Sequence, residues 1–87
     1  MATLNFKTPV DAKENRRLKD KFAKHLSQQI KEARRNKKMT QQELADKAGL
    51  HLTYVGHLEL GKYHPTVFVM WKIAKVLGVS IDKLIEI

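Results

Sequence analysis

The 87-residue sequence contains no cysteine, two prolines and four glycines, and few of its residues are aromatic. Without cysteine, a disulfide framework and a zinc site built on thiolates are both excluded. No stretch approaches the roughly 18 to 20 consecutive apolar residues that are needed to cross a bilayer, and the opening MATLNFKTPV has no apolar signal core. We therefore expect one small soluble domain in the cytoplasm, with no membrane partner.

Patterns typical of metal sites and of enzymes are also missing. The four histidines, His25, His51, His57 and His64, show neither HxH nor HxxxH spacing. No Ser, His and Asp grouping, glycine-rich phosphate loop or paired carboxylate cluster stands out. We expect no metal, no cofactor and no catalytic activity.

What the sequence does have is positive charge. Its 17 Lys and Arg residues outnumber nine Asp and Glu residues, for a formal net charge of +8. Eleven of the cations lie between Lys13 and Lys38, against three acids in the same segment. A single Lys or Arg here could simply solvate a helix, but the segment as a whole indicates a polyanionic partner.

Directly after this basic segment, local signals predict a short helix that ends at a tight turn. Thr40 and Glu43 have the spacing of a capping box, so a helix is expected to begin at about Gln41. Gly49 supplies the left-handed backbone conformation that ends a helix without a Cβ clash. The apolar residues between these signals share one face at helical spacing: Leu44, Ala45 and Ala48.

A second short helix is predicted after the turn, with one buried and one outward face. Val55 and Leu58 are three residues apart and point inward with Leu50. Thr53, Gly56 and His57 point away from that apolar side. Two short helices joined by a tight turn in a basic protein are what a reader of the DNA major groove requires.

The flanking sequence predicts three further helices. Apolar residues at three- or four-residue steps from Leu18 to Ala33 predict a long amphipathic helix over about 11–36. Its early members, Leu18 and Phe22, either extend beyond the compact domain toward a partner or fold back onto their own core. A fourth helix is expected over about 66–77 and a short fifth one after Ser80. We interpret residues 1–10 as a flexible arm or a short extended strand.

Surplus apolar surface is expected in two places. The run Val67 to Trp71 is apolar all round the helix, more than one buried face requires. A second patch is expected at the C-terminal end, formed by Ile81, Leu84, Ile85 and Ile87.

The spacing of these residues along the chain resembles that of a known family. The matching residues are Gln41, Leu44, Ala45, Gly49, Leu50, Val55, Leu58, Glu59, Gly61 and Pro65, continued by Ile73, Ala74, Leu77 to Ser80 and Leu84, and preceded by Ile30 and Arg34. This arrangement is similar to the helix-turn-helix of the phage lambda Cro and C1 repressors, also called the xenobiotic-response-element (XRE) family. The resemblance covers roughly residues 26–87. It implies an all-α, five-helix, lambda-repressor-like DNA-binding domain over residues 18–87, with residues 1–17 as an N-terminal arm and helix extension.

The resemblance also implies which residues meet double-stranded DNA. The positions that match the family's base readers are His51, Leu52, Thr53, Gly56 and His57. Two of them depart from the common pattern, since the family usually has a capping Ser, Thr or Asp at His51 and often a long polar side chain at Leu52. We therefore expect few direct contacts to bases and a correspondingly larger contribution from recognition of DNA shape. Candidates for phosphate contact are Gln41, Tyr54, Lys62, Tyr63, His64, Arg35 and Lys38.

Two structural roles and one biological role follow from the same resemblance. Arg34 and Glu59 are expected to form a partly buried ion pair between the first and third helices. Val67, Phe68, Trp71, Ile81 and Ile85 are the candidate dimer interface. The implied function is a sequence-specific, homodimeric transcriptional regulator, encoded by a bacterium or a phage, that acts on a near-palindromic operator. Restriction-modification controllers, phage repressors and antitoxins all fit, and so does a protein-interaction module, such as an antitoxin, with a toxin as partner.

Overall fold

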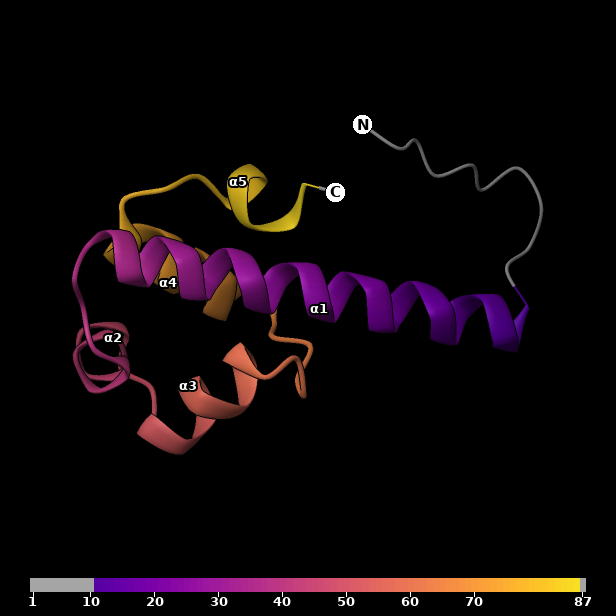
Figure 1. Ribbon diagram of the computed structural model, residues 1–87, viewed down its shortest axis with the longest axis horizontal. Coiled ribbons are helices and arrows are strands. Elements are labelled where there is room, and N and C mark those ends of the chain that lie inside the picture. Colours follow the sequence, from indigo (N-terminus) through magenta and orange to yellow (C-terminus); the bar gives the residue numbers. More distant parts are fainter. Residues whose placement is uncertain (1–10, 87) are drawn as a thin grey trace.

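The computed structural model describes residues 11–86, and within that range it contains five α-helices and no strand (Figure 1). The long helix α1 (Ala12–Asn36) is followed by the short helices α2 (Gln41–Ala48) and α3 (Leu52–Glu59). α4 (Val67–Leu77) and α5 (Ile81–Ile85) complete the chain. This arrangement confirms the predicted all-α fold. The arm expected at residues 1–10 lies outside the described residues.

Local capping chemistry sets the helix ends. The Asp11 carboxylate accepts a hydrogen bond from the Glu14 amide at 2.7 Å, which begins α1. Both halves of the Thr40–Glu43 capping box are present at the start of α2, and Gly49 ends that helix in the left-handed conformation with φ +67°. α3 differs, because His51 stands at its N-cap and makes no side-chain capping bond.

The core lies between the C-terminal half of α1 and the four short helices. Its wholly buried side chains come from every helix: Leu26, Ile30, Leu44, Val55, Leu58, Ile73, Leu77 and Leu84. Burying such a side chain stabilises the fold by about 1.5 to 3 kcal/mol. α2 and α3 pack against each other on one side of α1, and α5 packs on the other (Figure 1).

The prediction of a large C-terminal apolar patch is wrong for one of its members. Leu84 is fully buried, because α5 folds back onto α1 and inserts this side chain into the core. Ile81 and Ile85 are half-buried and pack against the same core, and Ile87 lies outside the described residues. The surplus apolar surface therefore lies on α4, where Val67, Phe68 and Trp71 are exposed by 68, 63 and 48%.

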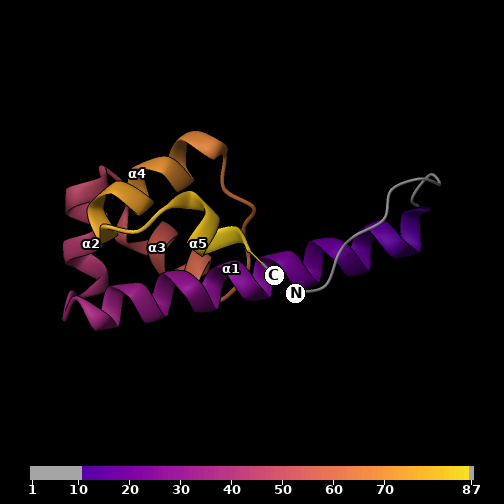
Figure 2. The same ribbon diagram turned by 90° about the horizontal axis from the view of Figure 1, so that it is seen from above.

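The N-terminal half of α1 projects beyond the rest of the molecule (Figure 2). A helix of 25 residues is about 37 Å long, and the longest dimension of the molecule is 42 Å. Phe22 is half-buried and packs against the core, whereas Leu18 is half-buried without joining it. Phe22 therefore folds back onto the core of its own domain, which is one of the two outcomes expected from the sequence. No helix in the range 11–86 combines the length and apolar character needed to cross a membrane.

Candidate nucleic-acid interface

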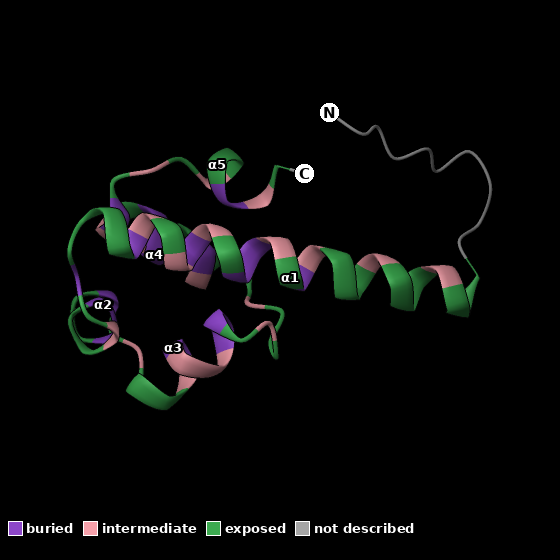
Figure 3. Cartoon of the chain, viewed as in Figure 1, coloured by how far each residue is buried: buried purple, intermediate pink, exposed green. Residues whose placement is uncertain are grey.

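α3 has a buried face and an exposed N-terminal end. Val55 and Leu58 are 0 and 1% exposed, which fixes the helix on the core. His51, Leu52 and Thr53 are exposed, and this end of α3 forms a protruding edge of the molecule (Figure 3). The side chains that the sequence assigned to base reading thus extend away from the fold at the start of α3, while Gly56 and His57, farther along, are half-exposed.

A buried polar network holds α3 against α1 and α2. Arg34 Nε and Nη2 donate to the two Glu59 carboxylate oxygens at 2.7 and 3.0 Å, and Arg34 Nη1 donates to the Met39 carbonyl at 2.7 Å. Gln41 Nε2 donates to Glu59 Oε1 at 3.1 Å. The hydrogen bonds that Arg34 donates to Glu59 raise the pKa of the Arg34 guanidinium above its ordinary value, so this cation is permanently charged. The predicted Arg34–Glu59 pair is therefore present, with Gln41 as a third member.

Gln41, one of the predicted phosphate contacts, uses part of its side chain within the protein. Its side chain is half-buried and turned toward Glu59, which uses one of the two N–H groups of the amide. The capping box occupies the amides of Thr40 and Glu43. The main-chain amides of Gln41 and Gln42 lie in the first turn of α2, where no intrahelical acceptor exists. These donors make the start of α2 suited to a phosphate.

Gly56 faces outward beside Gln41. A Cβ built at Gly56 would meet only Gln41 Oε1, at 3.8 Å, which is an ordinary van der Waals distance. The described residues therefore contain no steric reason for a glycine at this point of the helix.

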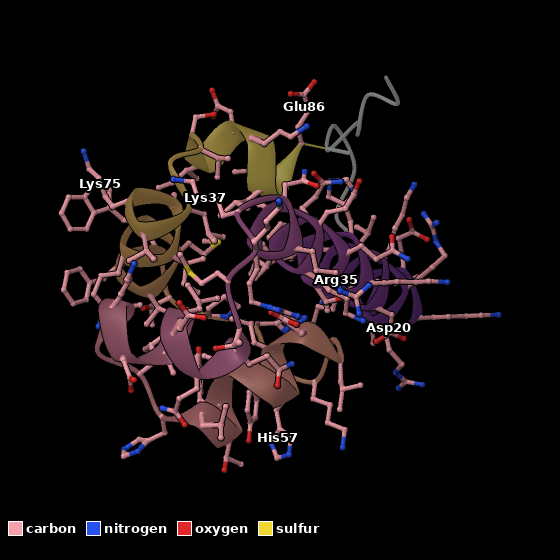
Figure 4. The ribbon with its side chains drawn as sticks, turned by 60° about the vertical axis from the view of Figure 1, so that its left-hand side comes forward. Asp20, Arg35, Lys37, His57, Lys75 and Glu86 are labelled. Atoms are coloured by element: carbon pink, nitrogen blue, oxygen red, sulfur yellow. The ribbon has the colours of Figure 1, made fainter. Side chains whose placement is uncertain are left out.

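Aromatic rings join α3 to the loop that follows it. Tyr54 stacks on Tyr63 with ring centroids 5.3 Å apart and an interplanar angle of 13°. His57 Nδ1 lies 3.1 Å from the Tyr63 hydroxyl, and Figure 4 shows His57 at the outer edge of the molecule. Burial, and secondarily the Tyr63 hydroxyl, raise the pKa of Tyr54 above its ordinary value. Tyr54 therefore stays a neutral hydrogen-bond donor near neutral pH.

His64 contacts α1. Its Nε2 donates to the Lys19 carbonyl at 3.1 Å, and its ring lies 6.5 Å from the Phe22 ring, nearly parallel at 17°. The loop from Gly61 to His64 thus contacts α1 through His64 and α3 through Tyr63. Lys62 in this loop is exposed, as are Arg35 and Lys38 near the start of α2. Of the seven predicted phosphate contacts, Tyr54 lies within α3 and Lys62, Tyr63 and His64 follow it, whereas Arg35, Lys38 and Gln41 lie between the end of α1 and the start of α2.

Sequence reasoning missed the contacts among these residues. The Tyr54–Tyr63 stack, the His57–Tyr63 contact and the His64–Lys19 bond carry no local pattern, because their members are 6 to 45 positions apart. Across residues 11–86, no three His, Cys, Asp or Glu side chains come together in a way that could hold a metal ion.

Comparison with known proteins decides the family. The family model described as helix-turn-helix matches residues 30–84, which is more than half of the chain. This chain belongs to the helix-turn-helix family. It is a transcriptional regulator with a helix-turn-helix DNA-binding domain of XRE type, as predicted, and this family is not one of enzymes.

Relatives of this helix-turn-helix protein include the immunity repressor protein of Bacillus phage phi105, which is 32% identical over 60 residues. That match covers 69% of this chain but only 42% of the phage protein. The control protein C.SmaI of Serratia marcescens is also 32% identical over 60 residues, which cover 69% of this chain and 71% of the relative. The crystal structure of the restriction-modification controller protein C.AhdI from Aeromonas hydrophila superposes with a TM-score of 0.69 at 29% identity, covering 71% of this chain and 94% of that one.

Proposed function

We propose that this protein binds a near-palindromic operator in double-stranded DNA as a homodimer, with α3 of each protomer in the major groove. The observation that carries the proposal is the exposed N-terminal end of α3, His51 to Thr53, on a helix whose opposite face is wholly buried. A recognition helix needs this combination, because base contacts come from its outward N-terminal residues while the rest of the domain holds it rigidly.

The base-reading side chains have unequal chemistry. Thr53 can hydrogen-bond a base edge and touch a thymine methyl group, and His57 can donate to guanine. Leu52 is 44% exposed and has only apolar contact to offer. Gly56 offers no side chain, so its contribution is close approach of the backbone. We therefore propose that discrimination depends on few direct contacts and substantially on DNA shape.

Phosphate contacts would position α3 in the groove without reading sequence. On one side they come from the start of α2 and from Arg35 and Lys38. On the other side they come from the loop residues Lys62 and Tyr63, with Tyr54 stacked behind them. His64 already uses Nε2 on the Lys19 carbonyl, so we assign it mainly to positioning this loop.

Dimerisation follows from the exposed apolar surface and from operator geometry. Two half-sites one DNA turn apart, about 34 Å, require a two-fold partner. Val67, Phe68 and Trp71 are three exposed apolar side chains within a single helix, α4, and Ile81 and Ile85 add half-buried area on α5. We assign the principal interface to α4.

The regulatory role is proposed from the relatives. Since they include a phage immunity repressor and restriction-modification control proteins, we propose that the chain represses or controls transcription in the bacterial cytoplasm. Residues 18–87 would form the helix-turn-helix domain, and residues 1–17 an arm and helix extension.

A second candidate is a protein-interaction module, for example an antitoxin part that binds a toxin. The stacked Phe68 and Trp71 rings favour it, because each carries a lysine ammonium above it, Lys72 at 5.1 Å and Lys75 at 5.6 Å. Aromatic rings beside cations suit an acidic, partly apolar protein surface.

Selection from a random duplex library tests the proposal and separates the two candidates. We expect the chain to enrich a near-palindromic sequence and to bind it in the presence of excess competitor DNA. The logarithm of its affinity should fall linearly with the logarithm of the salt concentration. Weak binding that competitor DNA abolishes would favour the protein-interaction module.

A further inference from the structure

The N-terminal half of α1 carries cations that the fold does not use. Lys13, Arg16 and Lys19 are exposed. In the described range 11–86, the carboxylates within 4.0 Å of a cation are Glu14, which pairs with Arg17, and Glu59, which pairs with Arg34. Lys13, Arg16 and Lys19 are therefore left without an ion-pair partner there. The family match begins only at residue 30, so these turns also lie outside the helix-turn-helix unit itself.

This part of α1 is fixed to the loop that flanks α3. The Lys19 carbonyl accepts the hydrogen bond from His64, and Phe22 lies against the His64 ring. A Cβ added at Gly61 would lie 3.6 Å from the Ala23 carbonyl oxygen, so loop and helix are in close contact there. The projecting turns of α1 thus leave the domain at the loop assigned to phosphate contact.

Helical register places the cations on the side that meets this loop. Residues three, four and seven apart share a face of a helix, so Arg16 and Lys19 lie on the same face as Ala23. Lys13 is one turn before Arg16. Asp20 is four residues from Arg16 and seven from Lys13, so this acid lies on the same face as the cations. The three cations span about 9 Å along the axis, which corresponds to about three base pairs of duplex.

We propose that this basic face of α1, formed by Lys13, Arg16 and Lys19, binds phosphates of duplex DNA outside the base pairs that α3 reads. The inference rests on the proposed operator binding and extends it by a second contact region. Because the projecting helix is a continuation of α1, its cations are held in place rather than on a flexible chain. Such a contact adds affinity and salt dependence but no base specificity.

A second copy of the chain is the competing occupant of this face. Leu18 is half-buried without joining the core, and a helix pair would cover it. The three cations argue against that pairing, since a two-fold contact would bring like charges together. Charge complementarity instead favours the DNA backbone.

The test compares two lengths of the duplex that the wild-type chain selects from a random library. One duplex ends at the outer base pairs of the half-sites, and the other has about half a turn, ~5 base pairs, added at each end. The test variant is the Lys13→Gln/Arg16→Gln double variant. Its charge-matched control is Lys37→Gln/Lys83→Gln, in which both lysines are exposed and Lys37 lies on the side of the molecule opposite His57 (Figure 4).

We expect the wild type and the control to bind the longer duplex about tenfold more tightly than the shorter one. The test variant should bind the two duplexes about equally. Its plot of log affinity against log salt concentration should have a slope shallower by about 0.9 for each phosphate contact removed. Asp20→Asn, which removes the adjacent acid, should increase the gain. All variants should keep the wild-type circular dichroism and base preference.

Three results would overturn the inference. A test variant that keeps the full length-dependent gain would show that these cations do not contact DNA. A test variant that dissociates into monomers, with the control unaffected, would assign the face to a second copy. A chain that selects no duplex at all would overturn the proposed function as well, whereas the first two results leave that function standing.

Discussion

The Arg34 guanidinium and the Glu59 carboxylate face each other between α1 and α3, with Nε 2.7 Å from Oε2 and Nη2 3.0 Å from Oε1. The two side chains retain only 11 and 1% of their exposure, so water screens the pair very little. Gln41 joins the same carboxylate from α2. One anion therefore sets the relative placement of the three helices that form the proposed DNA-binding surface.

Replacing Glu59 with Ala should destabilise the domain by roughly 3 to 5 kcal/mol, because it leaves the Arg34 cation buried without its partner. Urea denaturation followed by circular dichroism measures this loss. Glu32→Ala, at an exposed carboxylate of α1, should change stability by less than about 0.5 kcal/mol. A Glu59→Ala protein with the wild-type unfolding midpoint would refute the structural role of the pair.

Gly56→Ala should separate stability from DNA binding. A Cβ fits at this point without a clash, and Ala favours a helix over Gly by about 1 kcal/mol, so the melting temperature should rise. If α3 approaches DNA closely here, affinity for the selected duplex should fall at least about tenfold, the equivalent of ~1.4 kcal/mol. Fluorescence anisotropy at fixed salt measures this change, and a more stable variant with unchanged affinity would show that the α3 backbone does not approach DNA at Gly56.

Phe68→Ser/Trp71→Ser should convert a dimer into a monomer with little change in the fold. Phe68 and Trp71 are 63 and 48% exposed, so the monomer loses little packing when they are replaced. Sedimentation equilibrium measures the association, and Ile81→Ser/Ile85→Ser is the comparison on α5. Because Ile81 and Ile85 pack against the core, circular dichroism must first show that this second variant is folded. If only the α5 variant dissociates, the assignment of the interface to α4 is wrong.

Acid should weaken the start of α2. The Thr40 amide donates to the Glu43 carboxylate, and this bond lowers the pKa of Glu43 below its ordinary 4.5. A group with a lowered folded pKa stabilises the fold fully above its unfolded pKa, and this contribution is lost as pH falls through the folded pKa. Thermal melts from pH 7 down to pH 3 should therefore show a steeper loss for the wild type than for Glu43→Gln, in which the neutral amide keeps the box without titrating. Parallel pH profiles would contradict the role of this carboxylate.

The helices could be predicted from sequence because their ends are set by local chemistry. Thr40 with Glu43, Gly49, Gly78 and Ser80 each act within four residues, and the structure has helix ends at all of them. The Arg34–Glu59 pair was predictable only through the family resemblance, since 25 positions separate its members.

Side-chain partners across the fold could not be predicted in the same way. The hydrogen bonds from Gln41 to Glu59 and from His64 to the Lys19 carbonyl depend on how the helices and the loop pack together. Leu84 was assigned to a surface patch because an apolar residue in a short terminal helix shows the same pattern whether it meets another molecule or its own core. Only the packing of α5 on α1 distinguishes the two.

The most direct test of the central claim is an NMR titration of the isotope-labelled chain with the duplex that it selects. The account predicts that the largest amide shift changes fall on residues 51–57 and at the start of α2, with smaller ones in the loop 61–64. Changes confined to α4 and α5, with residues 51–57 unmoved at saturation, would contradict the assignment of α3 as the DNA-reading helix.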